Sequence, residues 1–168
     1  MVQITEGNLT FGFPEGAIVA KYDTCSFYRN QFNSAFGGTK AIDLIYVENN
    51  QTWLIEVKDY RRHNRTKTID IGDELALKVR DTLAGLAAAS FNANDQNEKR
   101  IAKQALRTRS IKIVLHIEQP SKHSKLFRQA IDPSKLEMKL KQALRAVDAH
   151  PIVVDMNSLT NKMNWKVT

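Results

Sequence analysis

The sequence is poor in cysteine and has no long apolar run. Cys25 is the only cysteine among 168 residues, so no disulfide can form within the chain, and a structural zinc site is not expected. The longest weakly polar run, LAGLAAASF, is far too short to span a bilayer. The first residues, MVQITEGNLT, lack the basic, apolar and small-residue order of a signal peptide. We therefore expect a cytoplasmic protein without a membrane partner.

Acidic residues are also scarce relative to basic ones. The chain has 18 Asp and Glu against 25 Lys and Arg, a net charge of +7. Such an excess points to a polyanionic partner, most often nucleic acid, although a merely solubilising surface explains it equally well. The chain lacks the Gly-Lys-Ser/Thr order of a phosphate-binding loop and the Gly-x-Ser-x-Gly of many hydrolases. Its length suits a single domain over residues 1–168.

Apolar periodicity predicts an α/β fold around a mixed sheet. We expect strands over 41–47, 52–58, 111–118 and 151–155, with a short last one in 164–168. We expect helices over 24–33, 73–91, 97–108 and 133–147. The strand at 111–118, IKIVLHIE, is apolar enough to be covered on both faces.

The first two strands form a predicted hairpin. They flank the sequence ENNQ, and Asn tolerates the positive φ that a two-residue turn at Asn49-Asn50 requires. Counting outward from this turn places Asp43 directly opposite Glu56. Residues two apart share a face, so Lys58 joins these two acids. The opposite face then carries apolar side chains, namely Leu44, Tyr46, Trp53, Ile55 and Val57.

Two carboxylates that face each other across a ladder repel, and something must offset that cost. Mg²⁺ does so well, because it takes oxygen ligands and is commonly held by one or two carboxylates together with water and phosphate. Lys58 would then lie beside the metal, where it could orient water or stabilise charge on a phosphoryl group. A basic run follows that could hold a phosphate backbone: Arg61, Arg62, Arg65 and Lys67.

The pattern Asp43, then Glu56-Val57-Lys58 across a hairpin, then a helix, resembles the core of the PD-(D/E)XK nuclease superfamily. The resemblance covers a core of roughly residues 24–117, with a C-terminal helix and strand extension over 131–168. It implies a restriction-endonuclease-like mixed central sheet with helices on both faces. It also implies Mg²⁺ held by Asp43, Glu56 and the backbone carbonyl of Val57, with Lys58 as the catalytic lysine. The whole chain further resembles an uncharacterised bacterial family.

Members of this superfamily often add an acid from the first helix and a polar residue from the helix after the hairpin. Asp23 at the start of the first expected helix, or Glu15 before it, is the candidate acid. Lys78 is the first candidate in the later helix and would contribute to nucleic-acid binding, with Arg80 as the alternative. The chain departs from the motif's name in carrying Ile42 where the proline would stand.

The Glu-x-Lys pattern by itself has little specificity, and the chain repeats it at 137–139 within a helical segment. The copy at Glu56 differs because it lies in WLIEVKDY, where a lone charge is hard to bury without a partner. The alternative is that Glu56 and Lys58 pair with other charges on an exposed sheet face. Asp59 points away from Lys58 and is interpreted as a strand-end residue.

The function predicted from these residues is a nuclease dependent on Mg²⁺ (or Mn²⁺ in its place) that hydrolyses phosphodiester bonds, acting on DNA in preference to RNA. The alternative is a non-catalytic nucleic-acid-binding or interaction module on the same fold. A subunit of a larger defence or repair complex is a third interpretation. Double-strand cleavage by so small a chain would call for a homodimer.

Overall fold

The computed structural model describes residues 1–63, 65–120 and 131–168. Its centre is a five-stranded mixed sheet in the order β3-β4-β5-β6-β7, in which β3 to β5 are antiparallel and β5 to β7 parallel. The strands are β3 (Ile18–Lys21), β4 (Leu44–Glu48), β5 (Gln51–Asp59), β6 (Ser110–Glu118) and β7 (Ile152–Val154). The expected α/β class with a mixed sheet is therefore confirmed. β6 is an interior strand between β5 and β7, and its residues Ile113–Glu118 are buried.

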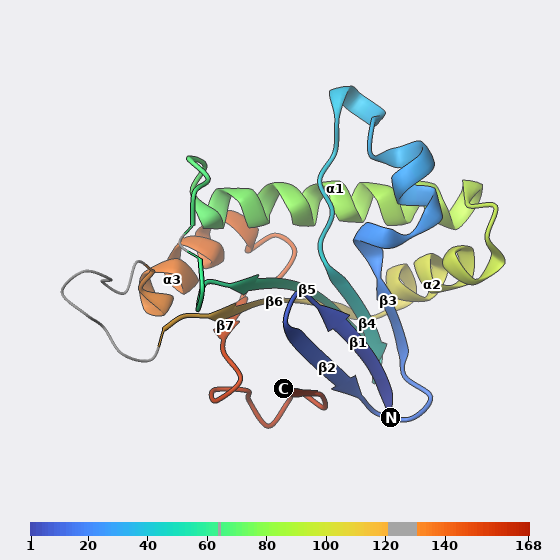
Figure 1. Ribbon diagram of the computed structural model, residues 1–168. Helices are drawn as coiled ribbons and strands as arrows, with labels where there is room; N and C mark the ends of the chain where they lie inside the picture. Colours follow the sequence, from blue (N-terminus) through green and yellow to red (C-terminus); the bar gives the residue numbers. More distant parts are fainter. Residues whose placement is uncertain (64, 121–130) are drawn as a thin grey trace.

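Three α-helices pack together on one face of this sheet. Figure 1 shows α1 (Ile71–Asn92) crossing the width of the molecule, with α2 (Gln96–Arg107) towards one of its ends and α3 (Pro133–Leu144) towards the other. Each helix begins at an aspartate whose carboxylate accepts one or two hydrogen bonds from backbone N–H groups of the first turn, a strong N-terminal signal. The three N-cap residues are Asp70, Asp95 and Asp132.

The opposite face of the sheet is covered by a second, smaller sheet. It has the order β1-β2-β8 and consists of β1 (Val2–Glu6), β2 (Leu9–Phe13) and β8 (Lys166–Val167). Its aromatic side chains, Phe11 and Phe13, join a separate hydrophobic core with Tyr46, Trp53 and Trp165. No helical residue takes part in that core as described. The expectation of helices on both faces is therefore wrong: helices cover one face and strands the other (Figure 1).

The helix expected over 24–33 is shorter and irregular: the chain is helical over 26–32, mostly in π-helical form. A 3-10 turn covers Tyr22–Thr24, and a π-helical turn follows at Tyr28–Phe32. The Glu98 carboxylate on α2 accepts hydrogen bonds from the backbone N–H groups of Ser26 and Phe27, at 2.6 and 3.0 Å. A contact from a residue seventy positions away therefore fixes this segment, and local sequence could not reveal it.

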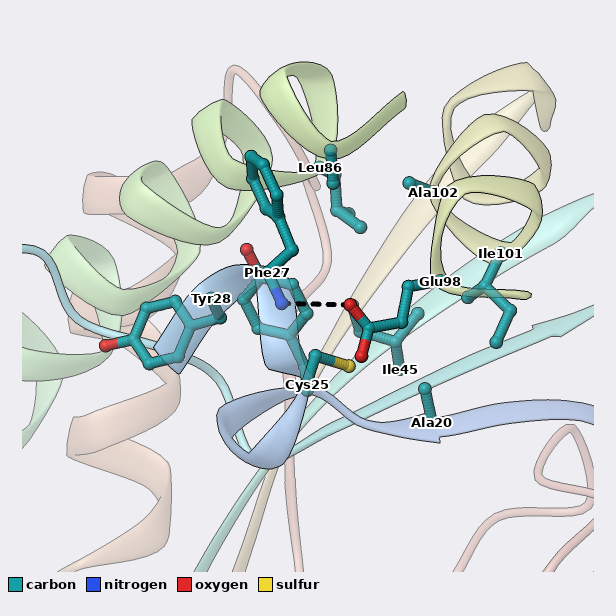
Figure 2. A pocket seen from close by; sticks show the side chains of 11 residues that line it. Ala20, Cys25, Phe27, Tyr28, Ile45, Leu86, Glu98, Ile101 and Ala102 are labelled. Carbon is teal, nitrogen blue, oxygen red and sulfur yellow. Dashed lines mark hydrogen bonds between the residues drawn. The ribbon is translucent and has the colours of Figure 1, made fainter. Parts of the chain in front are cut away.

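The contact with Glu98 lies beside a small cavity between this segment, the sheet and the helices (Figure 2). The cavity measures about 20 Å³ and is lined mostly by apolar side chains, so it has room for about one water molecule and no larger ligand. Cys25 lines it, and burial raises the pKa of its thiol to about 12.

None of the helices in the part of the chain that the structure describes combines the length and the apolar character needed to cross a membrane.

Candidate functional site

The β4–β5 hairpin has the register expected from its turn. Asn49 and Asn50 have φ values of 47° and 61°, and the ladder pairs Glu48 with Gln51 and continues to Leu44 with Ile55. One further step places Asp43 opposite Glu56. The Asp43 Oδ2 atom accepts a hydrogen bond of 2.7 Å from the backbone N–H of Val57, which holds the two strand ends together.

The two faces of the hairpin divide as predicted. The apolar side chains expected on one face all lie in the core beneath the small sheet, namely Leu44, Tyr46, Trp53, Ile55 and Val57. Glu56 and Lys58 lie on the other face, where α1 covers them. Glu56 is 1% exposed and Asp43 is 8% exposed, so both carboxylates are removed from water.

Two lysines meet the buried carboxylates. Lys58 Nζ and Lys78 Nζ both donate to Glu56 Oε1, each at 2.5 Å. Lys78 Nζ also lies 3.6 Å from Asp43 Oδ1, which places its ammonium group between the two acids. Lys78 comes from α1, one turn beyond Glu74, and α1 presents both side chains to the sheet. Lys78, the helix residue singled out from the sequence, is therefore part of the cluster.

These contacts show what offsets the repulsion between Asp43 and Glu56. Two ammonium groups pair with two carboxylates, so the cluster carries little net charge when all four groups are ionised. A buried charge is tolerated when it is paired and hydrogen-bonded, and removing one partner of such a pair typically costs about 3–5 kcal/mol. The cluster thereby fixes the first half of α1 on the sheet.

The protonation of Glu56 is nevertheless finely balanced. Burial raises the pKa of Glu56 to about 7, the charge of Asp43 adds to that rise, and Lys78 and Lys58 oppose it. The Oε2 atom of Glu56 is buried and has no hydrogen-bond partner among the described residues. For Lys58, burial alone would lower the pKa, but the charge and hydrogen bond of Glu56 raise it above its ordinary value. Glu56 is thus the group of this cluster that titrates near neutral pH.

A divalent cation does not fit this arrangement as it stands. The ammonium group of Lys78 fills the position between Asp43 and Glu56 that a bridging cation would need. Among the described residues, no three His, Cys, Asp or Glu side chains gather in a group that could hold a metal ion. Asp43, Glu56 and the Val57 carbonyl could therefore hold a cation only if the Lys78 ammonium group left this position.

Most of the basic run after β5 is paired with acids. Arg61 forms a two-point contact with Asp59, the last residue of β5, which agrees with the strand-end interpretation of Asp59. Arg65 and Lys67 both contact the carboxylate of Glu74. Arg62 is exposed. The run predicted to hold a phosphate backbone is therefore partly neutralised within the chain.

Glu74 is the member of this site that the sequence did not reveal. It is 1% exposed; burial alone would raise its pKa, but hydrogen bonds from Lys67 and Arg65 lower that pKa to about 2. The available signal was its position four residues before Lys78 on one helix face. Its partners come from a loop whose path the sequence does not specify.

The remaining candidates lie apart from the carboxylate pair. Glu15 is exposed and contacts the amino terminus. Arg80 is exposed and pairs with Asp81. Asp23 lies close enough to Asp43 for its charge to help raise the Asp23 pKa, although burial is the larger cause. Of the three, only Asp23 is near the cluster.

Comparisons with known proteins give one informative match. No family model matches the chain, and no solved structure matches it. The chain is 34% identical, over an alignment of 208 positions, to a cysteine–tRNA ligase of Neisseria meningitidis serogroup A. The alignment includes all of this chain and 30% of that ligase. The chain therefore spans less than a third of the length of this relative.

This match corrects the interpretation drawn from the motif. The relative is a ligase named for tRNA, not a nuclease. The assignment to the PD-(D/E)XK superfamily is therefore wrong, and so is the predicted function as a Mg²⁺-dependent nuclease. The pattern of Asp43, Glu56 and Lys58 has a structural explanation in the ion pairs that join the sheet to α1. Such networks produce the same short pattern without catalysis.

Proposed function

We propose that this chain is an RNA-binding domain related to part of a cysteine–tRNA ligase, and that tRNA is its nucleic-acid partner. The observation that carries the proposal is the 34% identity to such a ligase, which extends over the whole chain. The relative is an enzyme. In an enzyme of that kind, this chain would contribute the binding of tRNA.

The charge of the chain supports a nucleic-acid partner. A net charge of +7 favours association with a polyanion, because basic groups release the counterions condensed on phosphates. The match to a tRNA ligase favours RNA over DNA. The restriction-endonuclease-like arrangement stays a prediction about the fold alone, since a fold does not determine a function.

Binding assays with matched nucleic acids test the proposal. Fluorescence anisotropy would measure the Kd for a tRNA transcript, a DNA of the same sequence and a duplex DNA of equal length, at 50, 100 and 200 mM KCl. We expect the tRNA to bind at least ten times more tightly than either DNA, with an affinity that falls as salt rises. Equal affinity for the DNA of the same sequence, or no binding of tRNA at 50 mM KCl, would contradict the proposal.

Binding of Mg²⁺ or Mn²⁺ by Asp43 and Glu56 stays a prediction, and it would require Lys78 to withdraw from between them. Thermal unfolding with 0 to 10 mM MgCl₂ tests it, with Asp43→Asn as the matched variant. A rise in Tm of the wild type that the variant lacks would support a cation site. Equal responses of both proteins would exclude a cation at these carboxylates.

A further inference from the structure

One face of α2 carries a row of basic side chains. These are Lys99, Arg100, Lys103 and Arg107, here called the α2 stripe. An α-helix turns by about 100° per residue, so these four side chains lie within an arc of about 100° of the helix circumference. The residues that α2 buries lie on the opposite side of the helix: Ile101, Ala102 and Ala105. Arg100, Lys103 and Arg107 are exposed and Lys99 is half-buried, so the stripe faces solvent along about two turns.

The stripe has no acidic partners in the part of the chain that the structure describes. The sequence contains no Asp or Glu between Glu98 and Glu118, and no carboxylate of the described residues pairs with a stripe residue. Glu98, the acid nearest in sequence, turns towards Ser26 and Phe27 instead. Arg100 donates a hydrogen bond to Asn97, a neutral group.

The basic run after β5 differs in this respect. Arg61, Arg65 and Lys67 each contact a carboxylate. A base already paired within the protein must give up that partner, or share it, before it can neutralise a phosphate, whereas an unpaired exposed base need not. The stripe also lies on a regular helix whose apolar side is packed in the core, so its spacing is fixed before binding.

We infer that the α2 stripe is the surface that contacts the phosphate backbone of RNA, in place of the run at Arg61 to Lys67. This inference rests on the proposed function and adds the location of the RNA. α2 packs against α1, and Leu86 and Ala89 from the second half of α1 line the same cavity as Ile101 and Ala102 from α2. The carboxylate cluster lies beside the first half of α1, towards the other side of the molecule (Figure 1). The bound RNA would therefore lie over α2 and away from Glu56.

A pair of variants with equal charge tests the inference. The first combines Lys99→Gln, Lys103→Gln and Arg107→Gln on α2. The control combines Lys135→Gln, Lys141→Gln and Arg145→Gln at the exposed positions of α3 and its C-cap. Each removes two lysines and one arginine, and Gln is a good helix former. Circular dichroism and thermal unfolding would check that both remain folded.

The Kd for a tRNA transcript would be measured between 50 and 200 mM KCl. We expect the α2 variant to bind at least ten times more weakly than the wild type, and its salt slope to be shallower by about 2. The α3 control should stay within about threefold of the wild type. A third variant, Arg61→Gln with Arg62→Gln, should behave like the control.

Each other outcome overturns a different statement. Equal losses of tRNA affinity in the α2 and α3 variants would show that net charge alone determines binding. A loss of affinity confined to the variant of Arg61 and Arg62 would show that RNA binds at that basic run. Stripe-dependent binding to vesicles of phosphatidylserine, without binding to tRNA, would replace RNA by a lipid surface. A wild type that binds no tRNA would contradict the proposed function itself.

Discussion

At the scale of single residues, Glu56 is the least ordinary group in the chain. It is almost fully buried, it accepts from two lysines through one oxygen, and its other oxygen has no partner among the described residues. Burial raises its pKa to about 7, so it takes up a proton in a range where exposed carboxylates have long lost theirs. The charge balance of the cluster therefore changes around neutral pH.

Stability should depend on pH through Glu56. The folded chain releases the Glu56 proton near pH 7, whereas the unfolded chain releases it near the ordinary value of 4.5. Between these values the folded state binds more protons, so the free energy of unfolding contributed by Glu56 falls as pH rises. We expect Glu56→Gln to remove this fall, and urea unfolding at pH 5, 6, 7 and 8 would measure it.

The difference between wild type and variant is the quantity to compare, because His116 acts in the opposite direction. Burial lowers the pKa of His116, so its contribution to stability is lost as pH falls below about 6.5. His116 is present in both proteins, and its effect cancels in the difference. A difference that stays constant from pH 5 to pH 8 would show that Glu56 is ionised in the folded protein over this whole range.

Phe36 should be replaceable with a gain in stability. Its φ is 55°, a left-handed conformation that bulky residues rarely adopt, and its side chain is 87% exposed. Asn adopts this conformation at lower cost, so Phe36→Asn should stabilise the fold by about 0.5–1 kcal/mol. Phe91→Asn, at an exposed position of α1, is the matched control and should change stability little. Urea unfolding of both variants checks this prediction. A loss of stability in Phe36→Asn would mean that the edge contact between the Phe36 and Phe32 rings outweighs the backbone strain.

At the scale of elements, α1 is shaped by close packing against the chain that precedes β4. Gly85 lies in the middle of α1, where glycine costs stability relative to alanine. A Cβ at this position would lie 2.0 Å from Tyr22 Oη and 3.1 Å from the Phe32 ring. The glycine therefore allows the turns over residues 22–32 to approach the helix.

Gly85→Ala should destabilise the protein although alanine is the better helix former. The overlap with Tyr22 forces a shift in a packed region, at a cost of about 1–3 kcal/mol. Tyr22→Phe removes the overlapping hydroxyl, which has no hydrogen-bond partner among the described residues. In the double variant we expect most of the loss to be recovered. Urea unfolding of the two single variants and the double variant measures the coupling, and additive losses would contradict this explanation.

Elements with strong local signals were predictable from the sequence. The hairpin register followed from Asn49-Asn50 and alternating apolar residues, and this register also brought Asp43, Glu56 and Lys58 together. The β1–β2 hairpin was missed because β1 is only half buried and carries two apolar side chains among five residues, Val2 and Ile4. The first helix is shorter than expected and mostly π-helical, and its start is held by Glu98, which is distant in sequence.

The sequence could not show which cation lies between the two carboxylates, because that also depends on packing between distant segments. Repulsion between Asp43 and Glu56 requires a cation, and either a metal ion or an ammonium group satisfies that requirement. Lys78 takes this position because of how α1 packs on the sheet. Local patterns therefore located the site but did not determine its chemistry.

At the scale of the whole molecule, the two ends of the chain close the second hydrophobic core together. Thr10 and Thr168 exchange two backbone hydrogen bonds, of 2.7 and 3.0 Å. Trp165, 3% exposed, contacts the rings of Phe13, Tyr46 and Trp53. The last residues are therefore part of the structure that covers the central sheet.

Trp165→Ala should lower the free energy of unfolding by about 3–5 kcal/mol, since it removes a large buried ring. Trp165→Phe should cost less than half as much, and Met138→Ala, at a mostly exposed position, close to nothing. Urea unfolding followed by circular dichroism and by tryptophan fluorescence should give coincident transitions in the wild type. Separate transitions would show that the small sheet unfolds independently of the helical layer.

The cavity beside Glu98 gives the chain a built-in chemical reporter. Cys25, its only thiol, borders that cavity, and with a pKa of about 12 almost none of it is thiolate at neutral pH. An alkylating reagent would therefore react slowly with this half-buried thiol, and faster when the segment at Ser26 and Phe27 separates from α2. A change in the rate of that reaction would report a change in how often this contact opens, without any introduced label.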